Sequence, residues 1–185
     1  TGHLILAQEV LWQLGLDQLW FVPTGLPWMK RDESITDGVH RKAMVELAIK
    51  DNNAFFLSTS ELERPGETYT VDTLEEMRSG DMADDELLFV MGADTLHTLH
   101  LWKKPKRILE LARIIVALRP GYGPINLDAL LAVDPTASER IMTVQMPLIE
   151  ISGKELRRRA TRGESIKYLV PDQVAHYIDE HSLYR

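Results

Sequence analysis

The chain has 185 residues, of which 44% are hydrophobic, so we expect one domain with a substantial core over residues 1–185. The formal net charge of −7 argues against broad binding to a nucleic acid, although a local basic pocket can still hold a small anion. No apolar run reaches the roughly eighteen residues of a membrane span. Cysteine is absent, which excludes disulfides and thiolate metal sites and fits a reducing, cytoplasmic compartment.

Short apolar runs alternate with amphipathic stretches along the chain. The predicted strands are Gln18–Val22, Ala54–Ser58, Glu86–Met91, Arg113–Leu118 and Ile141–Gln145. Helices are expected from Leu4 to the stop at Gly15, after the cap Asp37, over Pro105–Ala112 and Asn126–Val133, from Ser152 to near Gly163, and over Pro171–Glu180. Strands separated by helices imply right-handed crossovers and a parallel sheet. The prediction is therefore an α/β, doubly wound fold whose C-terminal part, roughly 152–185, is helical.

Ligands of such folds bind beyond the carboxyl ends of the strands. This rule directs attention to four turns that follow strands or open helices. They are Pro23–Lys30, Gly92–Asp94, Arg119–Gly123 and Glu150–Lys154.

Two of the predicted helices open in a way that suits an anion. His3 lies at the start of the first helix, and Ser152 opens a later helix that carries Arg157 one turn further on. Helix openings offer unpaired amides and a positive dipole end, and a guanidinium adds charge-assisted hydrogen bonds. Each feature also has a plain interpretation, an exposed histidine or an ordinary capped helix. Together they favour a polyphosphate ligand and phosphoryl chemistry, which depends on positioning and charge neutralisation.

Three other motifs fail on inspection. Gly153-Lys154 lacks the P-loop glycine, because Leu148 occupies that position, and Gly121-x-Gly123 lacks the third glycine of a dinucleotide fingerprint. His97 and His100 have helical spacing, but no third ligand is evident, so we predict no metal site in the protein.

At this point several segments, in order along the whole chain, resemble the bacterial nicotinate-nucleotide adenylyltransferase family of the nucleotidyltransferase superfamily. Thr1-Gly2-His3-Leu4 resembles the end of the family's His-x-Gly-His motif, and Ile151-Ser152-Gly153-Lys154-Glu155-Leu156-Arg157 resembles its Ile-Ser-x-Thr-x-x-Arg motif. Further matching segments are Val22-Pro23 with Pro27 and Lys30, His40-Arg41-x-Ala43-Met44, Tyr69-Thr70-Val71-Asp72-Thr73-Leu74, Gly92-Ala93-Asp94-Thr95-Leu96 with Trp102, Arg119-Pro120-Gly121, and Tyr168-Leu169-Val170-Pro171.

The resemblance implies a Rossmann-like nucleotidyltransferase fold and a role for each matching residue. His3, Lys30 and Arg157 would act in catalysis, by binding phosphate and stabilising the transition state. The residues that would bind ATP are Gly2, His3, Gly92, Asp94, Arg119, Ile151, Ser152 and Arg157. Those that would bind the acceptor are Thr24, Lys30, Tyr69, Thr70 and Trp102.

Elementary chemistry supports the acceptor assignment. The pyridine ring of nicotinate mononucleotide is cationic, so the indole face of Trp102 suits it, unless that side chain is only a core anchor. We predict that Thr70 caps the following helix and leaves amides aimed at the nicotinate carboxylate. The carboxamide form would meet those donors with its own NH2 group, a mismatch that costs about 1–3 kcal/mol. A capping threonine without any ligand is the plain alternative.

Three departures from the family pattern stand out. The family's Gly-Gly-Thr-Phe-Asp-Pro segment and the first motif histidine would precede Thr1, so we expect the first central strand to be missing from this chain. Lys154 stands where threonine is usual, and Trp28-Met29 precede Lys30 where Pro-His is common.

The expected activity is transfer of AMP from ATP to nicotinate mononucleotide in NAD biosynthesis, with pyrophosphate released and Mg²⁺ carried by the ATP phosphates. The expected partners are these two small molecules, with no nucleic acid and no membrane, in a monomer or a homodimer. Two alternatives stay open, an adenylyltransferase for another acceptor such as pantetheine phosphate and a non-catalytic nucleotide-binding relative. A nicotinamide-dependent oxidoreductase has less support, because no glycine fingerprint follows a strand.

Overall fold

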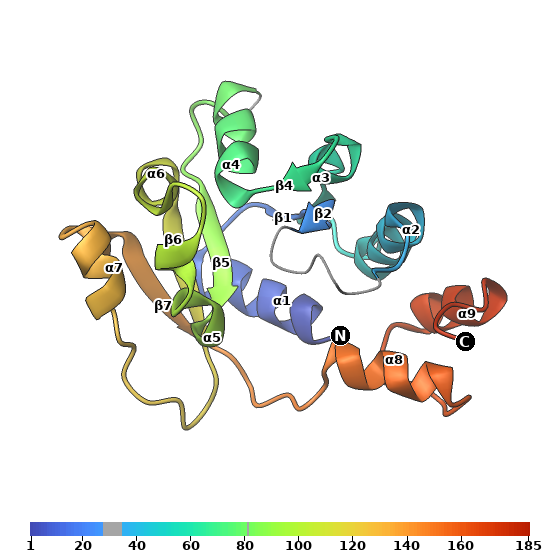
Figure 1. The fold of residues 1–185 in the computed structure, drawn as a ribbon. Coiled ribbons are helices and arrows are strands. Elements are labelled where there is room, and N and C mark those ends of the chain that lie inside the picture. Colours follow the sequence, from blue (N-terminus) through green and yellow to red (C-terminus); the bar gives the residue numbers. More distant parts are fainter. Residues whose placement is uncertain (28–34, 81) are drawn as a thin grey trace. The chain divides into compact units, whose positions relative to one another are not determined.

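The computed structural model describes residues 1–27, 35–80 and 82–185 (Figure 1). These residues form two compact units. The first unit comprises residues 1–23, 35–59 and 148–185 of the described ranges, and the second comprises residues 24–27, 60–80 and 82–147. The single domain expected over 1–185 stays a prediction. Within the described ranges, no helix combines the length and the apolar character that a membrane crossing requires.

The first unit consists of one pair of strands and four helices. Its elements are α1 (Gly2–Leu14), β1 (Leu19–Phe21), α2 (Gly38–Ile49), β3 (Phe55–Leu57), α8 (Gly153–Thr161) and α9 (Asp172–Glu180). β1 and β3 are parallel, with Leu19 opposite Phe55 and Phe21 opposite Leu57. Both strands are shorter than the sequence predicts, but they lie inside the predicted ranges. Parallel pairing of strands on either side of a helix confirms the crossover expected here.

Local signals set the ends of these helices, as predicted. Gly15 ends α1 in the left-handed conformation (φ 62°), which glycine adopts at no steric cost, and its N–H donates to the Leu11 carbonyl. Asp37 caps α2 by accepting a hydrogen bond from the Val39 N–H at 2.9 Å. The expected loop over Asp32–Thr36 lies partly outside the described residues.

Three helices of the first unit, α2, α8 and α9, share a small apolar core. It is centred on Ala160, Ile166, Val174 and Ile178, and packs against Met44, Leu47 and Ala48 of α2. The side chain of His40 on α2 reaches α9, where its Nδ1 lies 2.9 Å from the Tyr177 hydroxyl. α8 and α9, the helical C-terminal part expected from the sequence, are therefore tied to α2 by packing and by a polar contact.

The second unit is built on a three-stranded parallel sheet. Its elements are β2 (Leu26–Pro27), α3 (Ser60–Glu63), β4 (Glu67–Thr68), α4 (Thr70–Ser79), β5 (Leu88–Gly92), α5 (Ala93–Leu96), a 3-10 turn (Leu99–Leu101), α6 (Pro105–Leu111), β6 (Arg113–Leu118), α7 (Asp128–Val133), a second 3-10 turn (Ala137–Arg140) and β7 (Ile141–Gln145). The strand order is β5-β6-β7, and a separate short parallel ladder joins β2 and β4. The all-parallel pairing confirms the predicted α/β class.

The central strand β6 is buried on both faces. Ile114 and Val116 belong to a core cluster with side chains of α4, α6 and α7, and Ile115, which points the other way, is also fully buried. Continuous apolar runs of this kind are typical of parallel sheets covered on both sides. β6 and β7 span the predicted residues, whereas β5 begins two residues later than predicted.

Gly25 makes the closest backbone approach in the second unit. A Cβ atom built at this position would lie 2.1 Å from the Glu61 carbonyl oxygen and 2.7 Å from the Thr68 Cγ2 atom. No real Cβ atom tolerates such distances, and a carbonyl oxygen cannot rotate away as a side chain does. The absent side chain therefore allows the β2 segment to lie against α3 and β4.

Replacing Gly25 with alanine should therefore lower the free energy of unfolding by about 1–3 kcal/mol, because the backbone must shift to admit the methyl group. Thermal unfolding followed by circular dichroism measures the effect. Gly123→Ala is the matched control, since a Cβ there meets nothing within 4 Å and φ is not positive. Equal melting temperatures for the two variants would contradict the close approach.

Candidate active site

The openings of α1 and α8 lie side by side in the first unit, as Figure 1 shows near the label N. A Cβ at Gly2, the first residue of α1, would lie 4.0 Å from the carbonyl oxygen of Ile151, which precedes the α8 cap. The neighbouring Thr1 hydroxyl donates to the Leu169 carbonyl at 2.5 Å. The two amide-rich helix openings that the sequence singles out therefore share one region.

α8 opens with a side-chain cap that leaves backbone donors available. The Ser152 hydroxyl accepts a hydrogen bond from the Glu155 N–H at 3.1 Å. The N–H groups of Gly153 and Lys154 belong to the first turn, where an α-helix has no carbonyl partners for its donors. Arg157 folds back over this turn, because its Nη1 lies 3.3 Å from where a Gly153 Cβ would be. A guanidinium and unpaired amides thus meet at one helix end.

Three consecutive arginines on α8 have different partners. Glu155 accepts hydrogen bonds from Arg158 (2.5 and 2.7 Å) and from Arg159 (3.3 Å). These bonds, those from Arg158 above all, lower the pKa of Glu155 from 4.5 to about 2. Among the described residues, Arg157 has no ion pair, and its side chain is exposed. Its charge is therefore available to a ligand, whereas Arg158 and Arg159 pair with Glu155, and Arg158 also pairs with Glu164 just beyond the helix.

His3 lies in the first turn of α1 and is the second candidate for contact with an anion. Desolvation by the surrounding protein atoms lowers the pKa of its imidazole. The residue as a whole is exposed to solvent. At neutral pH the ring is thus mainly uncharged, and a phosphate ligand close to it would raise its pKa again.

Lys154 occupies the position at which the related motif has threonine. Its side chain is exposed in the first turn of α8, and it has no ion-pair partner within the part of the chain that the structure describes. Together with Arg157 it gives this helix end two unpaired cations. Such an arrangement favours an anionic ligand over a neutral one.

In the second unit, the carboxyl ends of β5 and β6 bring three predicted residues to one edge of the sheet. Gly92 ends β5, pairs in register with Ala117 and begins the short helix α5, whose first turn carries Asp94. Arg119 follows the end of β6 and is exposed. The structure thus places these residues where ligands bind to parallel sheets.

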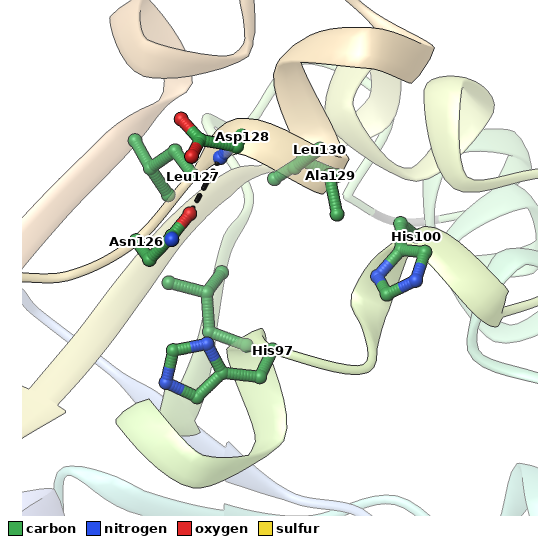
Figure 2. A pocket seen from close by; sticks show the side chains of 8 residues that line it. His97, His100, Asn126, Leu127, Asp128, Ala129 and Leu130 are labelled. Atoms are coloured by element: carbon green, nitrogen blue, oxygen red, sulfur yellow. Dashed lines mark hydrogen bonds between the residues drawn. The ribbon is translucent and has the colours of Figure 1, made fainter.

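A hydrogen bond joins the loops that follow β5 and β6. His97 Nε2 lies 3.1 Å from the Tyr122 hydroxyl. His97 also lines a pocket of about 330 Å³ together with His100 and the start of α7, where the Asp128 N–H donates to Asn126 Oδ1 at 2.8 Å (Figure 2). The described residues contain no group of three metal-binding side chains at this or any other place.

The start of α4 differs from the prediction. Thr70 does not cap this helix; the cap position is Tyr69, whose carbonyl accepts the N–H groups of Asp72 (3.0 Å) and Thr73 (3.3 Å). Tyr69 has extended backbone angles (φ −128°, ψ 137°) because it follows directly after the short strand β4. Thr70 is consequently the first residue of the helix, and its N–H is one of the donors without an intrahelical partner.

Trp102 is a partly buried residue whose indole ring has two contacts within the second unit. Its Nε1 donates to the Thr98 hydroxyl at 3.3 Å, and its ring meets Phe89 edge to face at 6.1 Å between centroids. Tyr69 and Trp102 both pack against the same apolar core as partly buried side chains. The two aromatic residues that the resemblance assigns to the acceptor therefore belong to one rigid part of the second unit.

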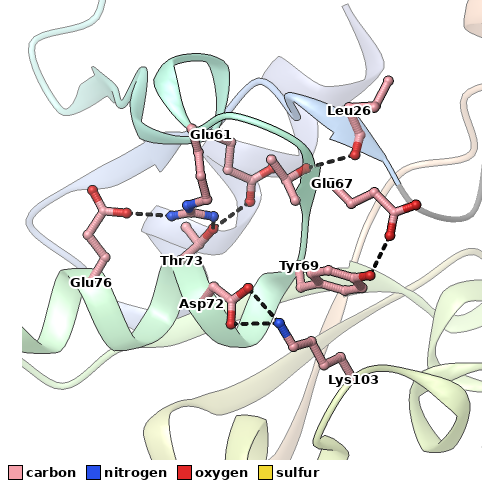
Figure 3. A network of polar contacts seen from close by, with 10 residues as sticks. Leu26, Glu61, Glu67, Tyr69, Asp72, Thr73, Glu76 and Lys103 are labelled. Atoms are coloured by element: carbon pink, nitrogen blue, oxygen red, sulfur yellow. Dashed lines mark hydrogen bonds and ion pairs between the residues drawn. The ribbon is translucent and has the colours of Figure 1, made fainter.

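A polar network around α4 escaped the sequence analysis (Figure 3). The Arg64 guanidinium binds the Thr73 hydroxyl at 3.0 Å and forms an ion pair with Glu76, and Thr73 donates to the buried Glu61 at 2.7 Å. These contacts fix α3 and α4 against each other. Their partners are nine to twelve residues apart and follow no periodic spacing, so no simple sequence signal reveals them.

The predicted site residues thus fall into two groups. The first unit holds Gly2, His3, Ile151, Ser152 and Arg157, and the second holds Thr24, Tyr69, Thr70, Gly92, Asp94, Trp102 and Arg119. Lys30 lies outside the described residues.

Comparison with known proteins identifies the family. A family model described as cytidylyltransferase-like matches residues 1–159. A protein of Thermomicrobium roseum, named a probable nicotinate-nucleotide adenylyltransferase, is 44% identical over 184 residues, which cover 100% of this chain and 85% of the relative. This chain belongs to the nicotinate-nucleotide adenylyltransferase family. A second member, from a Nocardioides species, is 40% identical and covers 99% of this chain and 87% of its own length.

Solved structures support the fold of this family member. The nicotinic acid mononucleotide adenylyltransferase of Plasmodium falciparum, complexed with NaAD, matches with a TM-score of 0.74. The match covers 99% of this chain and 90% of the other at 18% sequence identity, so it bears on the fold alone. The predicted α/β nucleotidyltransferase fold is confirmed.

The depressed pKa of Glu155 makes a testable statement about acid stability. An ionised Glu155 stabilises the folded state above pH 4.5, and this contribution is lost as the pH falls from 4.5 towards 2, because the unfolded chain binds the proton first. Glu155→Gln should therefore show a smaller fall in melting temperature between pH 6 and pH 3 than the unmodified protein. Glu180→Gln, at the end of α9, is the control. Identical pH profiles for all three proteins would refute the assignment.

Proposed function

We propose that this protein transfers AMP from ATP to nicotinate mononucleotide and so forms nicotinate adenine dinucleotide and pyrophosphate, a step of NAD biosynthesis. The observation that carries the proposal is the pair of adjacent helix openings in the first unit. There the unpaired Arg157 lies over the amides of α8, in a chain that shares 44% of its residues with a relative named for this activity.

The reaction requires charge neutralisation rather than a general base. A phosphate oxygen of nicotinate mononucleotide attacks the α-phosphorus of ATP, a new P–O bond forms, and the bond to the bridging oxygen of pyrophosphate breaks. The attacking oxygen is already anionic, so no side chain has to remove a proton. Negative charge accumulates on the α-phosphate and on the leaving group, where preorganised donors contribute most.

The residues of the first unit suit the ATP side of this reaction. We assign the triphosphate to the amides of the first turn of α8, with Ser152 at the cap and Arg157 as the bidentate donor. His3 contacts the phosphates and gains a proton as they bind, which turns a neutral ring into a cation where charge develops. Mg²⁺ arrives as part of MgATP, held by phosphate oxygens and water, which suits a protein whose described residues contain no carboxylate cage.

The residues of the second unit suit the acceptor and the nucleotide edge. We assign the cationic pyridine ring to the face of Trp102, and the nicotinate carboxylate to the donors at the start of α4 beside Tyr69. The printed title of one structural neighbour gives NaAD as its bound ligand, and that of another gives APC. We assign Gly92, Asp94 and Arg119, at the ends of β5 and β6, to contacts with the ATP nucleotide.

We also propose a cytoplasmic location. ATP is present in that compartment, and a cysteine-free chain needs no oxidising environment.

A pyrophosphate-release assay on the full-length protein tests the proposal directly. With MgATP and three acceptors in parallel, we expect nicotinate mononucleotide to give the highest kcat/KM. Nicotinamide mononucleotide should be about 5- to 150-fold poorer, because one mismatched donor costs about 1–3 kcal/mol. A preference for pantetheine phosphate would assign the protein to another acceptor. Binding of both substrates without turnover would make it a non-catalytic relative.

Trp102→Ala should weaken the use of the acceptor and leave that of ATP nearly unchanged. Loss of a cation–π contact worth about 0.5–2 kcal/mol raises the KM for nicotinate mononucleotide about 2- to 30-fold. Steady-state kinetics with each substrate varied in turn separate the two effects. Phe89→Leu, which changes the partner of the indole ring but not the ring itself, is the control. Equal losses for both substrates would argue that Trp102 is only a core anchor.

Arg157→Gln should weaken the use of ATP and leave that of the acceptor nearly unchanged, the reverse of Trp102→Ala. Removing a charge-assisted hydrogen bond to phosphate costs about 1.5–3 kcal/mol, so the KM for ATP should rise about 10- to 150-fold at an unchanged KM for the acceptor. Arg162→Gln, just after the end of α8, removes the same charge outside the proposed site and serves as the control. An equal rise in the KM for ATP in both variants would point to a general effect of net charge.

A further inference from the structure

Lys103 joins the two parts of the proposed acceptor site (Figure 3). It follows Trp102 directly in the sequence, and its Nζ lies 2.9 and 3.2 Å from the two carboxylate oxygens of Asp72, in the first turn of α4. The same Nζ lies 4.1 Å from the centre of the Tyr69 ring. One ammonium group thus contacts the cap residue of α4 and the carboxylate beside it.

Tyr69 is held from a second direction as well. Its hydroxyl donates to Glu67 Oε2 at 2.5 Å. With the hydroxyl fixed at one end and the ammonium over the ring face, the side chain has little freedom to rotate. Lys103 is therefore one of the groups that hold this ring at the start of α4.

The charge of Asp72 is the reason why this contact matters for an anionic acceptor. Asp72 lies two residues after Thr70, at the helix end to which we assign the nicotinate carboxylate. An unpaired aspartate there would repel a carboxylate, because like charges disfavour each other over several ångströms even at a high effective dielectric constant. The Lys103 ammonium cancels that charge. It leaves the amides of α4 as the groups that an incoming anion meets.

The plain interpretation of this pair is a surface salt bridge of little consequence. The side chains of Lys103 and Asp72 are 39% and 31% exposed, and pairs of this kind contribute little to stability. Two observations argue for more. The ammonium lies over the Tyr69 ring in addition to the ion pair, and both partners flank residues assigned to the acceptor. A measurement of protein stability therefore says little about the role of this ion pair. A comparison of the two acceptors as substrates tests that role.

We propose that Lys103 is a positioning residue that determines the specificity for the acid form of the acceptor. It neutralises Asp72 and holds Tyr69, so that the start of α4 accepts the carboxylate of nicotinate mononucleotide. A neutral carboxamide has no net charge for Asp72 to repel, so its use depends much less on Lys103. This inference rests on the proposed function, because it concerns the choice between two acceptors of the same reaction.

The test compares Lys103→Gln with Lys106→Gln, which removes the same charge from an exposed position on α6. Lys103→Gln should raise the KM for nicotinate mononucleotide about fivefold. The kcat, the KM for ATP and the kcat/KM for nicotinamide mononucleotide should change less than twofold. Lys103→Arg, which keeps the charge, should restore the lower KM. Raising the ionic strength should reduce the difference between Lys103→Gln and the unmodified protein, because salt screens exposed charges.

A double variant separates charge from structure. If Lys103 acts by cancelling Asp72, Asp72→Asn combined with Lys103→Gln should recover much of the KM lost in Lys103→Gln alone. If the ion pair serves only to hold the fold, the double variant should be no better than either single one, and that result would overturn the inference. So would a Lys103→Gln variant that behaves like Lys106→Gln. An unmodified protein that forms no dinucleotide from either acceptor would instead refute the proposed function itself.

Discussion

Parallel pairing of the strands is the constraint on which the candidate site depends. A parallel strand must return to its starting edge through a crossover, so every strand-to-helix turn in such a sheet emerges at the same edge. In the second unit this brings the residues after β5 and β6 together, and burial of β6 on both faces fixes the register that aligns Gly92 with Ala117. The first unit uses the same rule on a smaller scale, with β1 and β3.

Charge is distributed unevenly on the helices that carry the site. On α8, Arg158 and Arg159 pair with Glu155, and Arg158 also lies 3.8 Å from Glu164, so that among the described residues Arg157 and Lys154 remain without an ion pair at the helix opening. At the opening of α4, the Lys103 ammonium pairs with Asp72, the aspartate of the first turn. The two arrangements have a common result. At each opening the acidic side chain of the first turn, Glu155 on α8 or Asp72 on α4, is paired with a cation, although the chain as a whole carries a formal charge of −7.

The sequence predicted those features that depend on neighbours along the chain. Asp37 and Ser152 as caps, Gly15 as a stop and the apolar run of β6 are local signals, and the structure has each of them in place. Two-residue strands such as β2 and β4 carry no periodicity and were missed. Thr70 was taken for a cap because its hydroxyl suits that role, but the short strand before it sets the helix start one residue earlier. The contact of Lys103 with Asp72 joins residues 31 positions apart, which a single sequence does not reveal.

The two unpaired cations of α8 have a consequence for the stability of this helix. Lysine and arginine at the positive end of a helix oppose its dipole, and each such clash costs about 0.3–1 kcal/mol when no anion is near. An anion beside this turn would offset that cost, so anion binding and the stability of α8 are coupled at its opening.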